Sequence, residues 1–375
     1  MSSIYIHIPY CKKLCYYCDF HFSLQLNTKA EYISAVCKEL RLQKHFFSDT
    51  TIHTIYFGGG TPSVLTIHEI ETILHTIANI WNISPNAEIS FECNPDDITQ
   101  AYCSALLKLG INRISLGVQS FFDNELKLLN RRHTAEQAIS SIQLIQDSGC
   151  TNCTIDVIYG LPEQTLESWQ NTLEIVRGLE IQHISAYALG VEKKTALHSF
   201  VSKGTIILPQ EQLVLNQFNY LVNWAHENKF EQYEISNFAK HGFYSQHNSH
   251  YWHQKPYLGI GASAHSYDGT FRYWNIAHNA KYIAALSEGY IPREHEKLSP
   301  VDRFNEYIMT GLRTQWGISI AQIKNSLTND YFATFTSQIE TFKAQHVIEE
   351  KEGIIRITKK GICISDTIIS DLFIV

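Results

Sequence analysis

Stretches with the alternating pattern of β-strands and stretches with the periodicity of helices follow one another along the first half of the chain. After a short β-like run at the N-terminus, strands are expected at residues 52–57, 88–92, 113–117, 154–159 and 183–188. Helices are expected at residues 28–46, 66–81, 99–109 and 166–178, and also after Phe122 and after Thr134. Strands that alternate with helices form a parallel sheet. The sequence therefore predicts an α/β fold, a partial (β/α)6 barrel with its functional residues at the C-terminal ends of the strands.

The strand–helix alternation stops near Val191, and 375 residues exceed what one hydrophobic core usually supports. Further helices are expected at 210–228, 277–287 and 302–312, with a strand at 230–235 and a hairpin at 348–357. We expect a core domain at 1–235, a connecting segment rich in His and aromatic residues at 236–300, and a smaller domain at 301–375. The last is expected to be mixed or helical and winged-helix-like.

The composition is that of an ordinary globular protein, with 44% hydrophobic and 18% charged residues. A net charge of −7 and the lack of Lys/Arg-rich runs argue against a nucleic-acid-binding surface. The first residues lack the pattern of a signal peptide, and no apolar run approaches the length of a membrane span. The odd count of 9 cysteines fits a reducing compartment, so a cytoplasmic location is expected.

Three cysteines, Cys11, Cys15 and Cys18, follow the first strand-like run in the spacing C-x3-C-x2-C. A loop this short would strain any disulfide between them, and three thiols cannot all pair. Thiolates are the usual ligands of iron–sulfur clusters, and three of them would leave one iron of a 4Fe–4S cluster open to another ligand. The alternative is a zinc site, for which His7 or His21 could supply the fourth ligand.

Polar residues and glycines occur where the predicted strands end. Glycines 58–60 follow the second strand, Glu92 and Asn94 end the third, Gln119 follows the fourth, Asp156 lies in the fifth and Tyr187 ends the sixth. The glycine run lacks the Gly-Lys-Ser/Thr ending of a phosphate loop, but consecutive glycines let a ligand approach the backbone closely. Because the ends of parallel strands meet at one mouth of a barrel, we expect these residues to form one site.

Two other motifs have structural interpretations. Cys150 and Cys153 form a C-x-x-C motif between a helix and a strand, so Cys153 is expected to point into the sheet. Cys37 lies on the apolar face of the first helix and is expected in the core. Residues 259–264 match a loose dinucleotide-binding pattern, but no strand–helix–strand unit surrounds them.

The cysteine motif, with an aromatic residue before its last Cys, resembles the signature of the radical S-adenosylmethionine (SAM) superfamily. The longer string Tyr5-x-His7-Ile8-Pro9-Tyr10-Cys11 is similar to that of the oxygen-independent coproporphyrinogen III oxidase-like family. The resemblance implies that Cys11, Cys15 and Cys18 bind a 4Fe–4S cluster, that SAM binds its open iron, and that an electron donor is a partner. It also implies a set of SAM-contacting residues: Tyr5, Tyr17, Gly59, Gly60, Thr61, Glu92, Gln119, Arg131 and Asp156.

A second string, His247-Asn248-Ser249-His250-Tyr251-Trp252, resembles the HNxxYW motif of the haem-chaperone branch of that family. The oxidase has a fourth Cys where this chain has Phe20, which points the same way. The resemblance implies haem as a ligand, with contacts from His247, Asn248, Tyr251 and Trp252 and with His247 as axial ligand. Haem-accepting proteins, membrane-associated ones included, are the implied partners. The alternatives are an ordinary surface loop at 247–252 and, for the chain, the oxidase activity of porphyrin biosynthesis.

Overall fold

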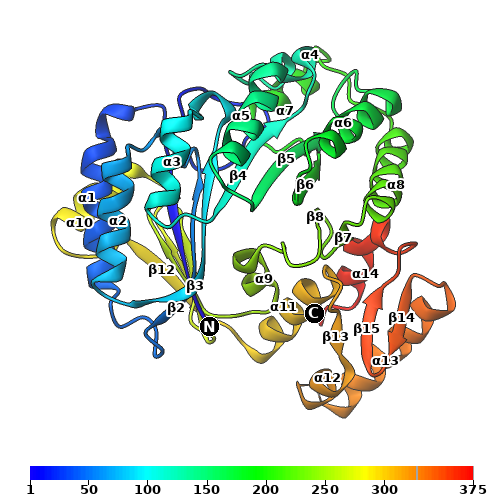
Figure 1. The fold of residues 1–375 in the computed structure, drawn as a ribbon. Helices are drawn as coiled ribbons and strands as arrows, with labels where there is room; N and C mark the ends of the chain where they lie inside the picture. The colour runs from blue at the N-terminus through cyan, green and yellow to red at the C-terminus, as the bar shows by residue number, and fades with distance from the viewer. Residues whose placement is uncertain (327, 375) are drawn as a thin grey trace.

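The computed structural model describes residues 1–326 and 328–374, and its centre is a curved sheet with helices on its outer face (Figure 1). Six consecutive strands pair in parallel, as the sequence predicts. They are β1 (Ser2–Ile8), β2 (Thr51–Gly59), β3 (Asn82–Cys93), β4 (Arg113–Gln119), β5 (Cys153–Tyr159) and β6 (His183–Ala188). Their C-terminal ends therefore share one mouth, where a site is expected.

The helices between these strands pack their apolar stripes on the sheet, apart from the six-residue helix Asp123–Leu128. They are α1 (Lys29–Leu42), α2 (Ile67–Ala78), α3 (Gln100–Lys108), α4 (Asp123–Leu128), α5 (Ala135–Asp147) and α6 (Leu166–Gly178). Capping boxes begin α2, α5 and α6. Thr28, where the sequence predicts the first helix to begin, ends a 3-10 turn, and its hydroxyl donates to the carbonyl of Gln25 and does not cap α1. The first helix also ends earlier than expected, at Leu42.

The sheet continues beyond β6 through short antiparallel strands. After α7 (Ala196–Ser202) and α8 (Glu211–Glu227), β8 (Asn237–Ala239) pairs with β6 and with β7 (Glu231–Gln232). The strand expected at 230–235 is thus reduced to the two residues of β7. Its neighbour Tyr233 turns inward and is fully buried.

Residues 236–300, where the sequence shows no clear periodicity before the helix expected at 277–287, also join this sheet. They form α9 (Gln246–Trp252), β9 (Tyr257–Ile260), β10 (His265–Tyr267), β11 (Phe271–Asn275), α10 (Asn279–Ser287) and β12 (Arg293–Lys297). β9 pairs in parallel with β1, so the N-terminal strand is not an edge. The complete sheet has 12 strands in the order β12-β11-β10-β9-β1-β2-β3-β4-β5-β6-β8-β7.

A small mixed unit ends the chain and has its own apolar cluster. It consists of α11 (Pro300–Leu312), β13 (Ile318–Ser319), α12 (Ile320–Ser326), α13 (Asn329–Ala344), β14 (Ile348–Lys351), β15 (Ile354–Ile357) and α14 (Ser365–Asp371). The hairpin expected at 348–357 is confirmed, and β13 completes a three-stranded antiparallel sheet. The domain boundaries at 235 and 300 stay a prediction. Within the described part of the chain, no helix is both long and apolar enough to cross a membrane.

Candidate active site

A cavity of about 430 Å³ opens at the C-terminal ends of the parallel strands. Its walls come from the loop after β1, the glycine run after β2 and the ends of β3 to β6. All but one of the residues that the resemblance implies for SAM line it: Tyr17, Gly59, Gly60, Thr61, Glu92, Gln119, Arg131 and Asp156. The exception, Tyr5, lies below the cavity with its hydroxyl bonded to the ring of His7.

The three cysteines of the motif lie together on one side of this cavity, in a loop that the protein holds firmly. The amide of Cys11 donates to the carbonyl of Ser23 at 3.0 Å, and Asn130 donates from Nδ2 to the carbonyl of Leu14 at 2.6 Å. Burial raises the pKa of the Cys18 thiol to about 11, because it disfavours a bare thiolate. A bound metal centre would supply the positive charge that the thiolates need.

Two side chains already point hydrogen-bond donors at the cysteine sulfurs. Thr61 donates from Oγ1 to Sγ of Cys11 at 3.4 Å, and Arg131 donates from Nη1 to Sγ of Cys15 at 3.3 Å. Donors to ligating sulfurs stabilise the thiolate and tune the potential of an iron–sulfur cluster. The donor set thus fits a cluster held by three cysteines.

The structure weakens the zinc alternative at both of its proposed fourth ligands. His7 is buried, and its Nδ1 and Nε2 are bonded to the Tyr5 hydroxyl and to the carbonyl of His21, each at 3.0 Å. Nε2 of His21 is bonded to Oδ1 of Asn279 at 2.7 Å. Among the described residues, no three His, Cys, Asp or Glu side chains are arranged to hold a single metal ion. A 4Fe–4S cluster does not need three side chains around one metal ion, because each cysteine would bind a different iron.

The glycines of the run are needed for close packing against β1 as well as for the opening of the cavity. Gly59 has φ +112°, and a Cβ there would lie 2.6 Å from the His7 ring. At Gly60 a Cβ would lie 2.9 Å from the backbone carbonyl of Ile8. The amide of Gly59 donates to Oε2 of Glu92 at 3.2 Å, which joins the run to the end of the neighbouring strand β3.

Two carboxyl groups and one guanidinium give the cavity its electrostatic character. Burial raises the pKa of Glu92 to about 8 and that of Asp156 to about 6. Arg131 donates from Nη2 to Oδ1 of Asn94 and to the carbonyl of Gly117, both at 2.7 Å, and its buried Nε lacks a partner among the described residues. Such a cavity suits a ligand with a carboxylate for the guanidinium and with hydroxyl or ammonium groups for the carboxyls.

A bulge in β4 aims Gln119 at the cavity. The register with β5 shifts between Gly117 and Gln119, and Gln119 has φ 68°, which is unusual for a residue with a side chain. Bulges beside functional sites commonly re-aim a side chain in this way.

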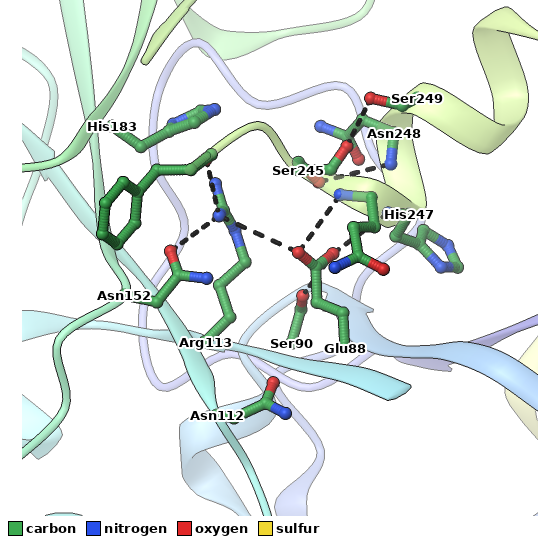
Figure 2. A network of polar contacts seen from close by, with 12 residues as sticks. Glu88, Ser90, Asn112, Arg113, Asn152, His183, Ser245, His247, Asn248 and Ser249 are labelled. Carbon is green, nitrogen blue, oxygen red and sulfur yellow. Dashed lines mark hydrogen bonds and ion pairs between the residues drawn. The ribbon is translucent and has the colours of Figure 1, made fainter. Parts of the chain in front are cut away.

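Residues 247–252 lie elsewhere, and the surface-loop alternative is wrong. They belong to helix α9, which packs at the end of the barrel where the strands begin (Figure 1). His247 is 1% exposed, and its ring nitrogens are bonded to Oγ1 of Thr54 at 2.7 Å and to the Tyr251 hydroxyl at 2.9 Å. Figure 2 shows His247 beside a buried polar network around Glu88 and Arg113. Asn248, Tyr251 and Trp252 are only partly exposed, and none of the four residues lines the cavity.

The remaining sequence motifs have the structural roles expected of them. Cys37, Cys150 and Cys153 are buried in the main core. At Gly261 a Cβ would lie 2.5 Å from the Tyr32 hydroxyl, so this glycine serves close packing. Sequence reasoning missed Tyr56, whose hydroxyl donates to Oε1 of Glu92 at 2.7 Å. Its period-two spacing from Gly58 is the signal that could have revealed it.

The chain is similar to several known proteins. The chain matches the radical SAM superfamily over residues 5–176 and the HemN C-terminal domain over residues 298–364. It is 31% identical to the heme chaperone HemW of Bacillus subtilis over 96% of each chain. It is 34% identical to HemW of Lactococcus lactis, covering 96% of this chain and 94% of that relative. The structure of coproporphyrinogen III oxidase (HemN) from Escherichia coli, a radical SAM enzyme, is similar with a TM-score of 0.86 at 24% identity, covering 99% of this chain and 90% of that one.

Proposed function

The chain belongs to the HemW family of the radical SAM superfamily, and from this premise we propose that it is a haem chaperone with a 4Fe–4S cluster and SAM as cofactors. In this function it binds haem and passes it to haem-dependent proteins. The observation that carries the cofactor part is the cavity itself. Three cysteines, two of them with donors on their sulfurs, face it together with Arg131, Glu92 and Asp156.

The residues predicted to bind the cluster and SAM have separate roles in this proposal. Cys11, Cys15 and Cys18 would hold the cluster, which supplies low-potential one-electron chemistry when bound. Arg131 would pair with the carboxylate of SAM, while Glu92 and Asp156 would accept from its ammonium or ribose hydroxyl groups. Tyr17, Gly59, Gly60, Thr61 and Gln119 would complete its surroundings. Tyr5 would not touch SAM directly, but its hydroxyl would hold the ring of His7, which lies beneath the glycine run.

Haem binding rests on the names of the relatives and not on a cavity of its own. Contacts from His247, Asn248, Tyr251 and Trp252 stay a prediction, on which the structure sets a condition. An axial ligand needs a free imidazole nitrogen, yet both nitrogens of His247 are bonded within the protein. Haem ligation by His247 would therefore require one of these two bonds to break and the buried ring to become accessible.

Location and partners complete the proposal. All nine cysteines, each in the described part of the chain, are free thiols, which suits a reducing compartment such as the cytoplasm. The partners would be haem-accepting proteins, membrane-associated ones included, and an electron donor for the cluster. The oxidase reading rests on likeness to the HemN structure, which at 24% identity speaks for the fold alone.

Two assays on one preparation test chaperone against oxidase. The protein is reconstituted anaerobically, titrated with haem by absorption spectroscopy, and incubated with SAM, a low-potential reductant and coproporphyrinogen III. We expect a saturable haem spectrum and no conversion of the porphyrinogen. Sustained decarboxylation would overturn the chaperone assignment, whatever the haem titration shows.

A further inference from the structure

The interior of the barrel is polar along its whole length, and α9 closes the end opposite the cavity. On β2, Thr54, Tyr56 and Gly58 point to the same side, because side chains of a strand alternate. On β3, Glu88, Ser90 and Glu92 do the same in register beside them. Both columns begin at α9 and end at the cavity, where Glu92 lies.

Helix α9 is fixed at its N-terminus by a buried carboxylate. Glu88 is 4% exposed, and its two oxygens accept from the amides of Gln246 and His247 at 3.1 and 3.0 Å. A carboxylate is favoured at this end of a helix. Arg113, itself buried, lies 3.9 Å from Glu88 and donates to the carbonyl of Phe243 just before the helix (Figure 2). The helix is therefore held in one position on the barrel.

His247 connects α9 to β2 through two contacts. Its Nδ1 is bonded to Thr54, and its ring stacks on Tyr56 with centroids 5.0 Å apart. Nε2 is bonded to the Tyr251 hydroxyl one helical turn on, so the orientation of the imidazole is fixed at both nitrogens. Two successive inward-facing side chains of β2 thus rest on one histidine.

Tyr56 in turn connects His247 to the cavity residue Glu92. Its hydroxyl donates to Oε1 of Glu92, and a Cβ on the adjacent Gly58 would lie 2.8 Å from its ring and 3.0 Å from the Glu92 carboxyl. A shift of the Tyr56 ring would therefore strain or break its bond to Glu92. Tyr5 also stacks with Tyr56, with centroids 6.1 Å apart, and lies 6.4 Å from the ring of His247.

We propose that His247 is a positioning residue for the SAM site: it fixes Thr54 and Tyr56 on β2 and thereby orients the carboxyl group of Glu92. This inference rests on the proposed binding of SAM in the cavity. It gives the 247–252 motif a role in SAM binding, where the sequence resemblance suggested direct contact with haem. Asn248 and Trp252 have no part in it.

The test measures SAM affinity by calorimetry on anaerobically reconstituted protein. His247→Ala should weaken binding about tenfold, a coupling within the range seen between contacting residues. Tyr56→Phe, which removes only the hydroxyl that holds Glu92, should weaken binding similarly. The double variant should be little worse than either single one, because both act through the same contact. Additive losses would contradict the proposal, since a merely structural role for His247 predicts them.

A matched control comes from the same helix. His250 is bonded through Nδ1 to Oγ of Ser3 at 2.7 Å and makes no ring contact with Tyr56. His250→Ala should change stability but leave SAM affinity within about twofold of wild type. If His247→Ala does not fold, Thr54→Val carries the test, because it removes the partner of Nδ1 and keeps the shape. Wild-type SAM affinity in whichever of His247→Ala and Thr54→Val folds would overturn the proposal.

The haem spectrum separates this role from axial ligation. His247→Gln retains a donor and an acceptor for Thr54 and Tyr251, so it should restore SAM affinity to within about threefold of wild type. Its haem spectrum should equal that of the unmodified protein. A lost haem spectrum with unchanged SAM affinity would instead identify His247 as the ligand. Lack of SAM binding by the unmodified protein would count against the proposed function itself.

Discussion

Arg131 is the side chain on which most of the cavity depends. It donates to Sγ of Cys15, to Asn94 and to the carbonyl of Gly117, and so connects the cluster loop with β3 and β4. A guanidinium can do this because its donors are fixed in one plane, whereas an ammonium is a single point of charge. The same residue is the proposed partner of the SAM carboxylate.

Arg131→Lys should therefore weaken SAM binding by at least about tenfold, or about 1.4 kcal/mol, although the charge is kept. The measurement is calorimetric titration of the reconstituted protein. Arg132→Lys is the control, because Arg132 is exposed and pairs with Asp96 across 3.3 Å, outside the cavity lining. Equal SAM affinities for the unmodified protein and both variants would show that SAM binding does not depend on the planar guanidinium of Arg131.

Burial lowers the pKa of His247 to about 3, which makes it a contributor to acid unfolding. The unfolded chain binds a proton at this position below its ordinary pKa of about 6.5, while the folded protein does not. Stability from the neutral imidazole is therefore complete above that value and is lost as the pH falls toward 3. The groups packed around the ring are Thr54, Tyr56 and Tyr251, with Tyr5 and His250 nearby.

Between pH 7 and pH 5 the wild type should lose about 2 kcal/mol more stability than His247→Gln, since 1.5 pH units correspond to about that energy. The other buried acids and bases are common to both proteins and cancel in the difference. Urea unfolding at the two pH values gives the free energies. Parallel losses in both proteins would mean that His247 is already charged or accessible in the folded state.

Among the elements, those with long periodic patterns could be predicted from sequence and those with short ones could not. The bounds of α6 and β6 agree with expectation, and in α6 the buried residues recur at helical spacing, at Trp169, Thr172, Leu173 and Val176. Strands β8 and β10 have three residues each, too few for a period to show. Helix α9 has seven residues and is buried by polar contacts, so no apolar stripe marks it.

The docking of α9 depends on the buried pair of Glu88 and Arg113. Glu88→Gln leaves Arg113 without its counter-charge, a change that typically costs about 3 kcal/mol or more in a buried pair. We expect that loss in the free energy of urea unfolding. Glu71→Gln, at a largely exposed side chain, should stay within about 0.5 kcal/mol of wild type. A similar small effect of Glu88→Gln would show that α9 is held by other contacts.

For the whole molecule, the sequence predicted the parallel barrel and the gathering of polar residues at one mouth, since both follow from the order of strands and helices. It did not predict that β9 would pair with β1, because that contact joins residues more than 250 positions apart. Nor did the sequence show whether a glycine is needed for access of a ligand or for close packing against the backbone. Gly60 was expected to admit a ligand, but its closest neighbour is the backbone of Ile8.

The central claim is that three cysteines of this chain hold a 4Fe–4S cluster at the barrel mouth. Iron and acid-labile sulfide analysis of the anaerobically reconstituted protein tests it most directly. We predict about four irons and four sulfides per chain in the unmodified protein, and their loss on replacing Cys11, Cys15 or Cys18 by Ala. Cys37→Ala and Cys153→Ala, at buried core thiols, should keep the full content. One tightly bound zinc without sulfide, or a full cluster in Cys15→Ala, would contradict the account.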